Sequence, residues 1–335
     1  METFCQKLPK IELHAHLNGS LSKSTLKQLG CSEESIKNYQ ETLTDIKQVF
    51  NQFQVAHNAT NTLENLNLAT KCVIEDFAKD NVIYLELRTT PRSEKDLSER
   101  DYIETVVEAI RNYESSKIIV KLILSLDRRR SWKEQLDTLD NIIDLKQKYP
   151  DLIKGVDLSG DPGKGEFFKK LFEKARDNGL KTAIHCGEIK NDNEVMDILD
   201  FKPDRIGHGT CLHPDYGGSE EIWQKYQHLK IPIECCLTSN VVCLTSKSYE
   251  EHHVKELLKN SLPFSLATDD KGVFNTTLSK EFTVLGQTFS LSKNDLWNIS
   301  RNSIDYSFAD EEEKGFIRFA LEQWKIRNIE NYPNF

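Results

Sequence analysis

The sequence predicts an α/β fold, specifically a (β/α)8 TIM barrel with a helical insertion after the first strand. Three observations predict it: eight short apolar runs recur along the 335 residues, amphipathic stretches separate them, and polar residues of catalytic type follow the runs. Alternating strands and helices predict a parallel sheet, and eight such units are what this class of barrel requires. A doubly wound open sheet is disfavoured because no glycine-rich phosphate loop follows the first run.

Each expected strand is a short run of apolar and often β-branched residues. No low-complexity tract or Gly/Ser-rich linker divides the chain, so residues 1–335 are expected to form one domain. The long stretch from Ser20 to Asp80 is expected to hold several helices, as an elaborated first crossover. In chain order, the expected strands are Ile11–Leu17, Val82–Leu87, Ile118–Leu126, Ile153–Leu158, Lys181–His185, Arg205–His208, Ile231–Leu237 and Pro263–Thr268.

Helices are expected where apolar residues recur three and four positions apart, which is the spacing of one helix face. A further helix is expected from Glu311, with Phe316, Phe319 and Trp324 packing on the barrel. The four periodic sets are Leu63, Leu66, Val73 and Phe77; Ile103, Val106, Val107 and Ile110; Leu136, Leu139, Ile142 and Ile143; and Phe167, Phe168, Leu171 and Phe172.

Composition argues against several classes of function. The chain has 44 basic and 53 acidic residues and a formal net charge of −9, whereas a binder of nucleic-acid polymers needs a basic face. No apolar run approaches the roughly 18 residues that cross a membrane, and residues 1–7 lack a signal-peptide core. The eight cysteines form no C-x-x-C pair, which favours reduced thiols in a cytosolic (cytoplasmic) enzyme. With no heptad pattern, we expect a monomer.

Polar residues of catalytic type fall at the ends of the expected strands. In barrels of this class the active site lies at the carboxyl ends of the strands, so these residues are expected to meet at one rim. Scattered surface residues would not sort in this way. In strand order they are His14 and His16; residues 88–92; Asp127; Gly160 and Asp161; His185 and Glu188; His208; residues 238–240; and Asp269 and Asp270.

The pair His14 and His16 suggests a metal site. Side chains two apart on a strand share one face, so both imidazoles can reach one ion. His185 would add a third imidazole and Asp269 a carboxylate, and three nitrogens with one oxygen suit zinc with a position left for water. Taken singly, each residue could equally be a hydrogen-bonded side chain at a strand end. Cysteine is not needed as a ligand, and Cys186 is expected to point away from His185.

The neighbours of these residues suggest hydrolysis. Zinc lowers the pKa of bound water toward about 7, which supplies hydroxide near neutrality. Glu188 could protonate a ring nitrogen during attack on the adjacent carbon, and His208 could hold or deprotonate the water. Asp270 could accept a hydrogen bond from the substrate or the water. The alternatives are a solvated carboxylate for Glu188 and a structural histidine for His208.

Together these residues resemble the adenosine deaminase superfamily of zinc amidohydrolases. The matching stretches are Glu12-Leu13-His14-Ala15-His16-Leu17, His185-Cys186-Gly187-Glu188, Arg205-Ile206-Gly207-His208-Gly209-Thr210 and Thr268-Asp269-Asp270. The H-x-E and P-C-x-x-C signature of the cytidine-deaminase type is absent. The resemblance implies one zinc ion on His14, His16, His185 and Asp269, proton donation to purine N1 by Glu188, orientation of the water by His208, and purine contacts at Gly160 and Asp270.

One position separates nucleoside from nucleotide substrates. True adenosine deaminases of this superfamily carry Asp where this chain has Asn18. A carboxylate would repel a 5′-phosphate, by up to a few kcal/mol for like charges near 4 Å at intermediate dielectric, whereas an amide can donate a hydrogen bond. Thr89, Thr90 and Arg92 could form a phosphate cradle. The alternative is a proline turn with a solvated arginine.

These departures resemble the N6-methyl-AMP deaminase branch of the family. That branch implies hydrolysis of N6-methyl-AMP, and of related N6-substituted purine nucleoside monophosphates, to IMP and an amine such as methylamine. An adenosine deaminase or an AMP deaminase is the alternative. A catalytically silent binding protein is disfavoured because no catalytic position is replaced, and nothing favours a partner-binding scaffold. The implied substrate contacts are His16, Asn18, His57, Thr89, Thr90, Arg92, Asp127, Gly160 and Asp270.

Overall fold

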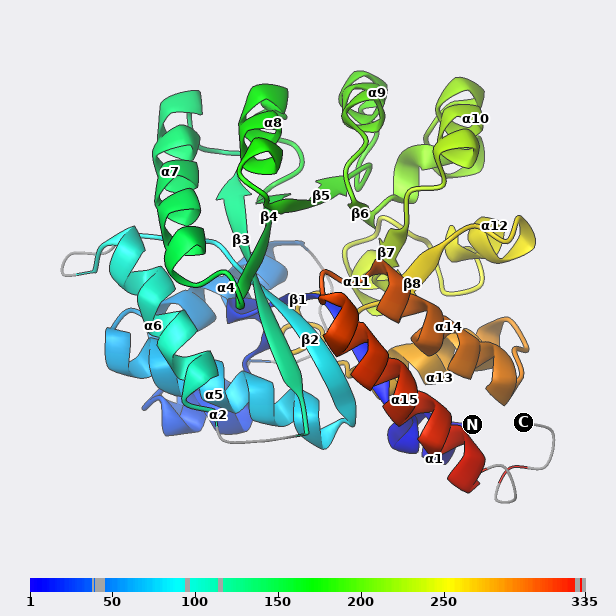
Figure 1. Ribbon diagram of the computed structural model, residues 1–335, viewed down its shortest axis with the longest axis horizontal. Helices are drawn as coiled ribbons and strands as arrows, with labels where there is room; N and C mark the ends of the chain where they lie inside the picture. The colour runs from blue at the N-terminus through cyan, green and yellow to red at the C-terminus, as the bar shows by residue number, and fades with distance from the viewer. Residues whose placement is uncertain (38, 40–45, 94–96, 114–116, 329–331, 333–335) are drawn as a thin grey trace.

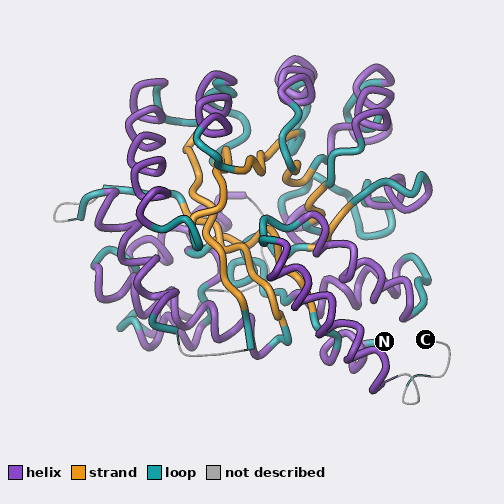
Figure 2. The backbone as a smooth tube through the Cα atoms, viewed as in Figure 1, coloured by secondary structure: helices purple, strands orange, loops and turns teal. Residues whose placement is uncertain are grey.

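Eight parallel strands pair in chain order from β1 to β8 and form a nearly closed barrel, with helices on the outside (Figures 1 and 2). The computed structural model describes residues 1–37, 39, 46–93, 97–113, 117–328 and 332. The predicted TIM-barrel-like fold is confirmed. The strands are β1 Lys10–His16, β2 Val82–Thr89, β3 Ile119–Asp127, β4 Ile153–Ser159, β5 Lys181–Cys186, β6 Arg205–His208, β7 Ile233–Cys235 and β8 Phe264–Leu266.

Helices alternate with the strands, and the predicted insertion between β1 and β2 is present. Reciprocal capping boxes fix the starts of α6, at Ser98 and Asp101, and α7, at Ser131 and Glu134. The helical elements are α1 Glu2–Lys7, η1 Asn18–Ser20, α2 Lys23–Gln28, α3 Glu33–Lys37, α4 Ile46–Ala59, α5 Leu63–Lys79, α6 Glu99–Arg111, α7 Trp132–Lys148, α8 Lys169–Asp177, α9 Asp192–Phe201, η2 Thr210–Leu212, η3 Pro214–Tyr216, α10 Glu220–Leu229, α11 Leu237–Val242, α12 Val254–Lys259, α13 Leu278–Thr288, α14 Lys293–Tyr306 and α15 Glu311–Asn328.

Some predicted boundaries are wrong. β7 covers Ile233–Cys235 only, and α11 begins at Leu237. β8 covers Phe264–Leu266 only. α8 begins at Lys169, with Phe168 as its N-cap residue. Apolar content marked these segments correctly, but backbone hydrogen bonding to the neighbouring strand decides where a strand ends.

Of the three α15 residues expected to pack inward, Trp324 does so, with its ring centroid 5.7 Å from that of Phe4, and the two phenylalanines do not. Ile317 and Leu321 are buried, whereas Phe316 and Phe319 are 61% and 63% exposed. Apolar residues occur on both faces of this helix, so sequence periodicity could not choose between them. Figure 1 shows α15 crossing the molecule beside α14.

The barrel closes through the same segments that carry three of the predicted metal ligands. The amide of His16 donates to the carbonyl of Asp269 at 3.0 Å, and the amide of Asp269 donates to the carbonyl of His14 at 2.9 Å. Ala15 and Asp269 accordingly form a parallel bridge beyond the end of β8. Closure therefore places the histidine pair of β1 directly beside Asp269.

The interior of the barrel contains buried charges as well as apolar side chains. Arg205 Nε donates to Glu234 at 2.5 Å, and the same guanidinium pairs with Glu86. Arg88 pairs with Glu234, and its Nη1 lies 3.5 Å from Asp157. All five side chains are at most 1% exposed. If one charge of such a network is removed, its partner stays buried without compensation, in surroundings that solvate ions poorly.

Backbone and hydroxyl groups supply further hydrogen bonds to Glu86 and Arg205 in this network. Tyr84 donates to Glu86 at 2.8 Å, and the amide of Phe308 donates to the same carboxylate at 2.5 Å. Arg205 Nη1 donates to the carbonyl of Tyr306 at 2.8 Å. The segment after α14 is thereby tied to the barrel interior.

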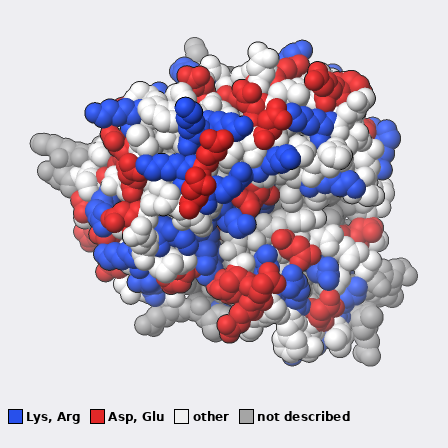
Figure 3. Space-filling view, turned by 45° about the horizontal axis from the view of Figure 1, so that its top comes forward, with Lys and Arg blue, Asp and Glu red and all other residues white. Residues whose placement is uncertain are grey.

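At the surface, Lys and Arg are interspersed with Asp and Glu on the face drawn in Figure 3. Among the described residues, no helix is both long enough and apolar enough to span a membrane.

We expect Arg205→Met to lower the free energy of unfolding by about 3–5 kcal/mol, because it leaves Glu86 and Glu234 buried with fewer partners. Urea unfolding followed by circular dichroism measures the change. Arg301→Met is the control, since Arg301 is 41% exposed and lies 3.8 Å from Glu322, and it should change stability by less than about 0.5 kcal/mol. Equal effects of the two substitutions would contradict this role of Arg205.

Candidate active site

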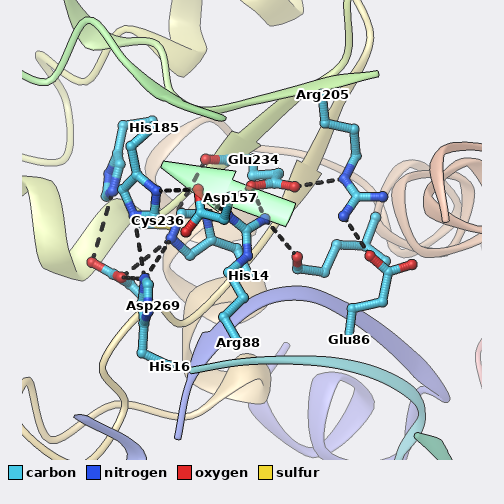
Figure 4. Close-up of polar contacts among 12 residues, drawn as sticks. His14, His16, Glu86, Arg88, Asp157, His185, Arg205, Glu234, Cys236 and Asp269 are labelled. Carbon is cyan, nitrogen blue, oxygen red and sulfur yellow. Dashed lines mark hydrogen bonds and ion pairs between the residues drawn. The ribbon is translucent and has the colours of Figure 1, made fainter. Parts of the chain in front are cut away.

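Four donor atoms meet where β1, β5 and β8 end (Figure 4). His16 Nε2 lies 3.2 Å from His14 Nε2 and 3.2 Å from His185 Nε2. Asp269 Oδ1 lies 3.3 Å from the Nε2 atoms of both His14 and His16. A tetrahedral site with metal–ligand distances of about 2.0–2.1 Å has edges of about 3.3–3.4 Å. These atoms are therefore spaced like the ligands of one metal ion.

His208 lies against this cluster. Within the described part of the chain, two overlapping groups have donor atoms within 4.8 Å of one another and could hold a metal. The group that includes His208 is fully buried, and the second group shares His185 with it. The structure thus has one buried His/Asp metal site at the rim of the barrel. The two groups are His14, His185, His208 and Asp269, and His16, Asp157 and His185.

Buried carboxylates orient two of these imidazoles. Glu234 Oε2 lies 2.7 Å from His14 Nδ1, and Asp157 Oδ1 lies 2.8 Å from His185 Nδ1. A carboxylate accepts the proton of Nδ1 and leaves the lone pair of Nε2 free for a metal. Both Nε2 atoms face the donor cluster, so the two rings are already oriented to bind a metal.

Neighbouring basic groups hold the pKa of both carboxylates below its ordinary value. Burial raises the pKa of Glu234, but Arg88 and Arg205 outweigh burial and hold that pKa well below its ordinary value. Burial likewise raises the pKa of Asp157, and His185 and Arg88 outweigh it, so the pKa is lowered. Charged carboxylates are the stronger acceptors for the imidazole N–H groups.

Both predicted catalytic residues lie beside the donor cluster. Glu188 is in the loop after β5, and its Oε2 lies 3.8 Å from His208 Nε2. His208 Nε2 is also 3.9 Å from Asp269 Oδ2. A pocket next to His185 and Glu188 is lined on its other side by Arg128 and Pro162, from the loops after β3 and β4.

The carboxyl group of Asp270 differs from that of its neighbour Asp269 in its hydrogen bonding and in its pKa. Its Oδ1 is buried and has no hydrogen-bond partner among the described residues. Burial, followed by the charges of Asp269 and Glu188, raises the pKa of Asp270 well above its ordinary value. A protonated carboxyl can donate a hydrogen bond. A Cβ at Gly19 would lie 1.6 Å from Asp270 Oδ1, so only glycine lets the chain pass this close.

The predicted phosphate cradle is a hydrogen-bonded cluster on the insertion side of the rim. Thr60 Oγ1 donates to Asn18 Oδ1 at 2.9 Å and accepts from Arg92 Nη2 at 2.8 Å. Asn18 Nδ2 donates to the Tyr102 hydroxyl at 3.3 Å, which in turn lies 2.6 Å from Thr89 Oγ1. The structure therefore brings Asn18, Thr89 and Arg92 together, through two residues that were not predicted.

The other residues predicted on this side are less directly linked. Thr90 Oγ1 lies 3.2 Å from Ser159 Oγ at the end of β4. His57, on α4, is half-buried, and its carbonyl accepts from Arg92 at 3.3 Å. The backbone of His57 is thus fixed beside the cradle.

Asp127 and Gly160 lie side by side at the ends of β3 and β4. Arg129 Nε donates to Asp127 Oδ1 at 2.9 Å. Gly160 has a φ of +110°, and a Cβ there would lie 2.7 Å from Asp127 Oδ1. Glycine is therefore required here both by the backbone conformation and by the close approach of the carboxylate.

Several side chains of the site were not predicted. Asp157 and Glu234 carried a signal that could have found them, since each is an acidic residue flanked by apolar residues within a strand. Thr60 and Tyr102 carried none. Ser239 lies within residues 238–240, which were expected at the rim, but it was given no role. Ser239 Oγ donates to Asp269 Oδ2 at 2.7 Å, which orients that carboxylate.

Comparison with known proteins identifies the family. The family model described as adenosine deaminase matches residues 9–324, which is nearly the whole chain. The chain belongs to the adenosine deaminase family. It is a deaminase, an enzyme that hydrolyses C–N bonds.

Relatives of this deaminase include proteins named for adenosine and for N6-methyl-AMP. It is 42% identical over 327 residues to the adenosine deaminase-like protein of Drosophila melanogaster, covering 94% of this chain and 95% of that one. It is 41% identical over 325 residues to the N6-methyl-AMP deaminase of Danio rerio, covering 92% and 93%. The crystal structure of Arabidopsis ADAL complexed with IMP superimposes with a TM-score of 0.88 at 36% identity, covering 98% and 99% of the two chains.

We expect Asp157→Asn to weaken metal binding by about 10- to 100-fold, because the amide cannot replace the carboxylate that orients His185. Competition against a chelator of known affinity measures it. Asp161→Asn is the control, since Asp161 pairs only loosely with Lys164, at 3.3 Å, outside the barrel interior. Unchanged affinity in Asp157→Asn would contradict the orienting role of this carboxylate.

Proposed function

We propose that this protein is a zinc-dependent deaminase that hydrolyses N6-methyl-AMP, and related N6-substituted purine nucleoside monophosphates. Water adds to purine C6 and the C6–N6 bond breaks, which gives IMP and, from N6-methyl-AMP, methylamine. The observation that carries the proposal is a tetrahedral donor set at one side of the rim and a neutral-to-basic cluster, Asn18, Thr60 and Arg92, at the other. A relative named for this activity, matched over 93% of its length, and a relative crystallised with IMP support it.

The donor set suits zinc in its chemistry and in its spacing. Three imidazole nitrogens and one carboxylate oxygen, at tetrahedral separations, are ligands that zinc accepts readily. We propose His14, His16, His185 and Asp269 as these ligands, with one ion per chain. When bound, zinc supplies Lewis-acid activation of water at neutral pH.

The chain's own residues would position the water and move the protons. His208, 3.8 Å from Glu188, would hold the attacking water with a lone pair directed at C6. Glu188 would donate a proton to N1, so that negative charge does not accumulate on the ring as C6 is attacked. Protonated Asp270 would donate to another ring nitrogen, and Gly160 leaves room for the purine edge. The purine is thereby fixed by donors matched to its acceptor nitrogens.

The opposite side of the rim would hold the ribose phosphate. Asn18 presents an amide where a carboxylate would repel the phosphate, and Arg92 adds a positive charge 2.8 Å from Thr60. Thr89 and Thr90 supply hydroxyl donors. His16, His57 and Asp127 complete the proposed substrate contacts. We further propose that residues 1–335 form one catalytic domain.

Zinc-loaded protein should convert N6-methyl-AMP to IMP, and should turn over AMP, N6-methyladenosine and adenosine much more slowly. Mass spectrometry of the purine products measures all four. Arg92→Ala should lower nucleotide turnover by roughly 10- to 100-fold, the value of a lost charge-assisted contact, while any nucleoside turnover changes little. Faster turnover of adenosine than of N6-methyl-AMP would show a nucleoside deaminase instead.

Glu188→Gln should lower kcat by about 100- to 10,000-fold, because glutamine keeps the shape of the side chain but cannot supply a proton. Zinc content and IMP binding by calorimetry should remain those of the wild type, which separates this effect from loss of the site. Glu194→Gln, in the same pocket but paired with Arg128 at 2.9 Å, is the control. Full turnover by Glu188→Gln would remove Glu188 from the mechanism.

A further inference from the structure

A chain of buried hydrogen bonds leads from the backbone to His208. The amide of Val254 donates to His252 Nδ1 at 3.1 Å. A backbone N–H can only donate, so Nδ1 of His252 is an acceptor and carries no proton. Burial lowers the pKa of His252 well below its ordinary value, which keeps the ring neutral. The single ring proton of His252 is therefore on Nε2.

This proton fixes the orientation of the next side chain, Asn240. His252 Nε2 lies 3.0 Å from Asn240 Oδ1, and a donor at that position requires the amide oxygen there. Thr245 fits the same orientation. Its hydroxyl can donate to the backbone carbonyl of Asn240, 3.2 Å away, and accept from Asn240 Nδ2, 3.0 Å away. The contact with His252 thus places the NH2 group on the side facing His208.

The second amide proton of Asn240 then determines the tautomer of His208. Asn240 Nδ2 lies 3.2 Å from His208 Nδ1, so this ring nitrogen is the acceptor. We propose that Asn240 and His252 are positioning residues that fix His208 as the Nε2–H tautomer, a hydrogen-bond donor aimed at the attacking water. The inference rests on the proposed function for the identity of that water, but the tautomer is a property of the protein alone.

The same logic separates His208 from the imidazoles that would bind the metal. At His14 and His185, carboxylates accept the Nδ1 proton and leave the Nε2 lone pair free. At His208, an amide donates to Nδ1, so the proton occupies Nε2 and no lone pair faces the cluster. His208 is therefore a donor beside the metal site rather than a ligand, although its distance alone would allow either.

This assignment also narrows the role of His208 in the reaction. With its proton on Nε2, the ring can hold the water oxygen but cannot accept a proton at that atom. All three side chains of the relay, at positions 208, 240 and 252, are at most 2% exposed, so solvent does not offer an alternative partner. The relay acts through geometry, because His252 contacts Asn240 and Asn240 contacts His208.

Nitrogen-15 NMR of zinc-loaded protein labelled at histidine tests the tautomer directly. The His208 signals are assigned by their loss in His208→Asn. We expect a protonated Nε2 and an unprotonated Nδ1 for His208. The opposite tautomer would overturn the proposal. This readout requires no turnover, so it stays valid even if N6-methyl-AMP proves not to be the substrate.

Substitution of the relay tests its contribution to catalysis. Asn240→Asp has nearly the same shape but presents an acceptor to His208 Nδ1, which moves the ring proton to Nδ1. We expect kcat to fall by roughly 100-fold or more, the effect of losing one preorganised donor, with little change in KM. Thr245→Val is the matched control, because it removes the other amide contact and leaves the His208 contact in place.

Wild-type kcat in Asn240→Asp, or an equal loss in Thr245→Val, would overturn the proposal. If Asn240→Asp does not fold, His252→Phe removes the lock on the amide orientation. Its His208 spectrum should then show both tautomers, and a spectrum unchanged from wild type would equally overturn the proposal.

Discussion

The ion pairs buried inside the barrel are the constraint on which the active site depends. Arg88 lies between Glu234 and Asp157, and these two carboxylates hold the imidazoles of His14 and His185 (Figure 4). Charges buried this deeply are tolerated only when each has partners, so they constrain one another's positions. The buried ion pairs inside the barrel, rather than the surrounding loops, therefore set the geometry of the metal site.

The two sides of the rim are built by different parts of the chain. Three of the four donors, His14, His16 and Asp269, lie on segments whose backbone hydrogen bonds also close the barrel. Closure of the barrel therefore brings these three together, and His185 joins them from β5. The cradle around Asn18 instead depends on Thr60 from the insertion and Tyr102 from α6. Strand ends thus position the donor set, and the insertion supplies contacts that we propose bind the substrate.

Imidazole chemistry in this site is set by the partner of each Nδ1 atom. Carboxylates at His14 and His185 direct lone pairs inward, while the Asn240 amide directs a proton inward from His208. One residue type thereby serves two purposes within a few ångströms.

The sequence by itself determined the fold class, the eight strands and the residues at their carboxyl ends, because strand periodicity and the position of polar residues are local properties. It also singled out His14, His16, His185 and Asp269, whose roles were implied by motifs. It could not determine that Asp157 and Glu234 support two of these rings, or that Thr60 joins Asn18 to Arg92. Nor could it place the buried face of α15 or the proton of His208. Those depend on contacts between residues far apart in the chain, and only the packed barrel decides which polar groups share a buried space.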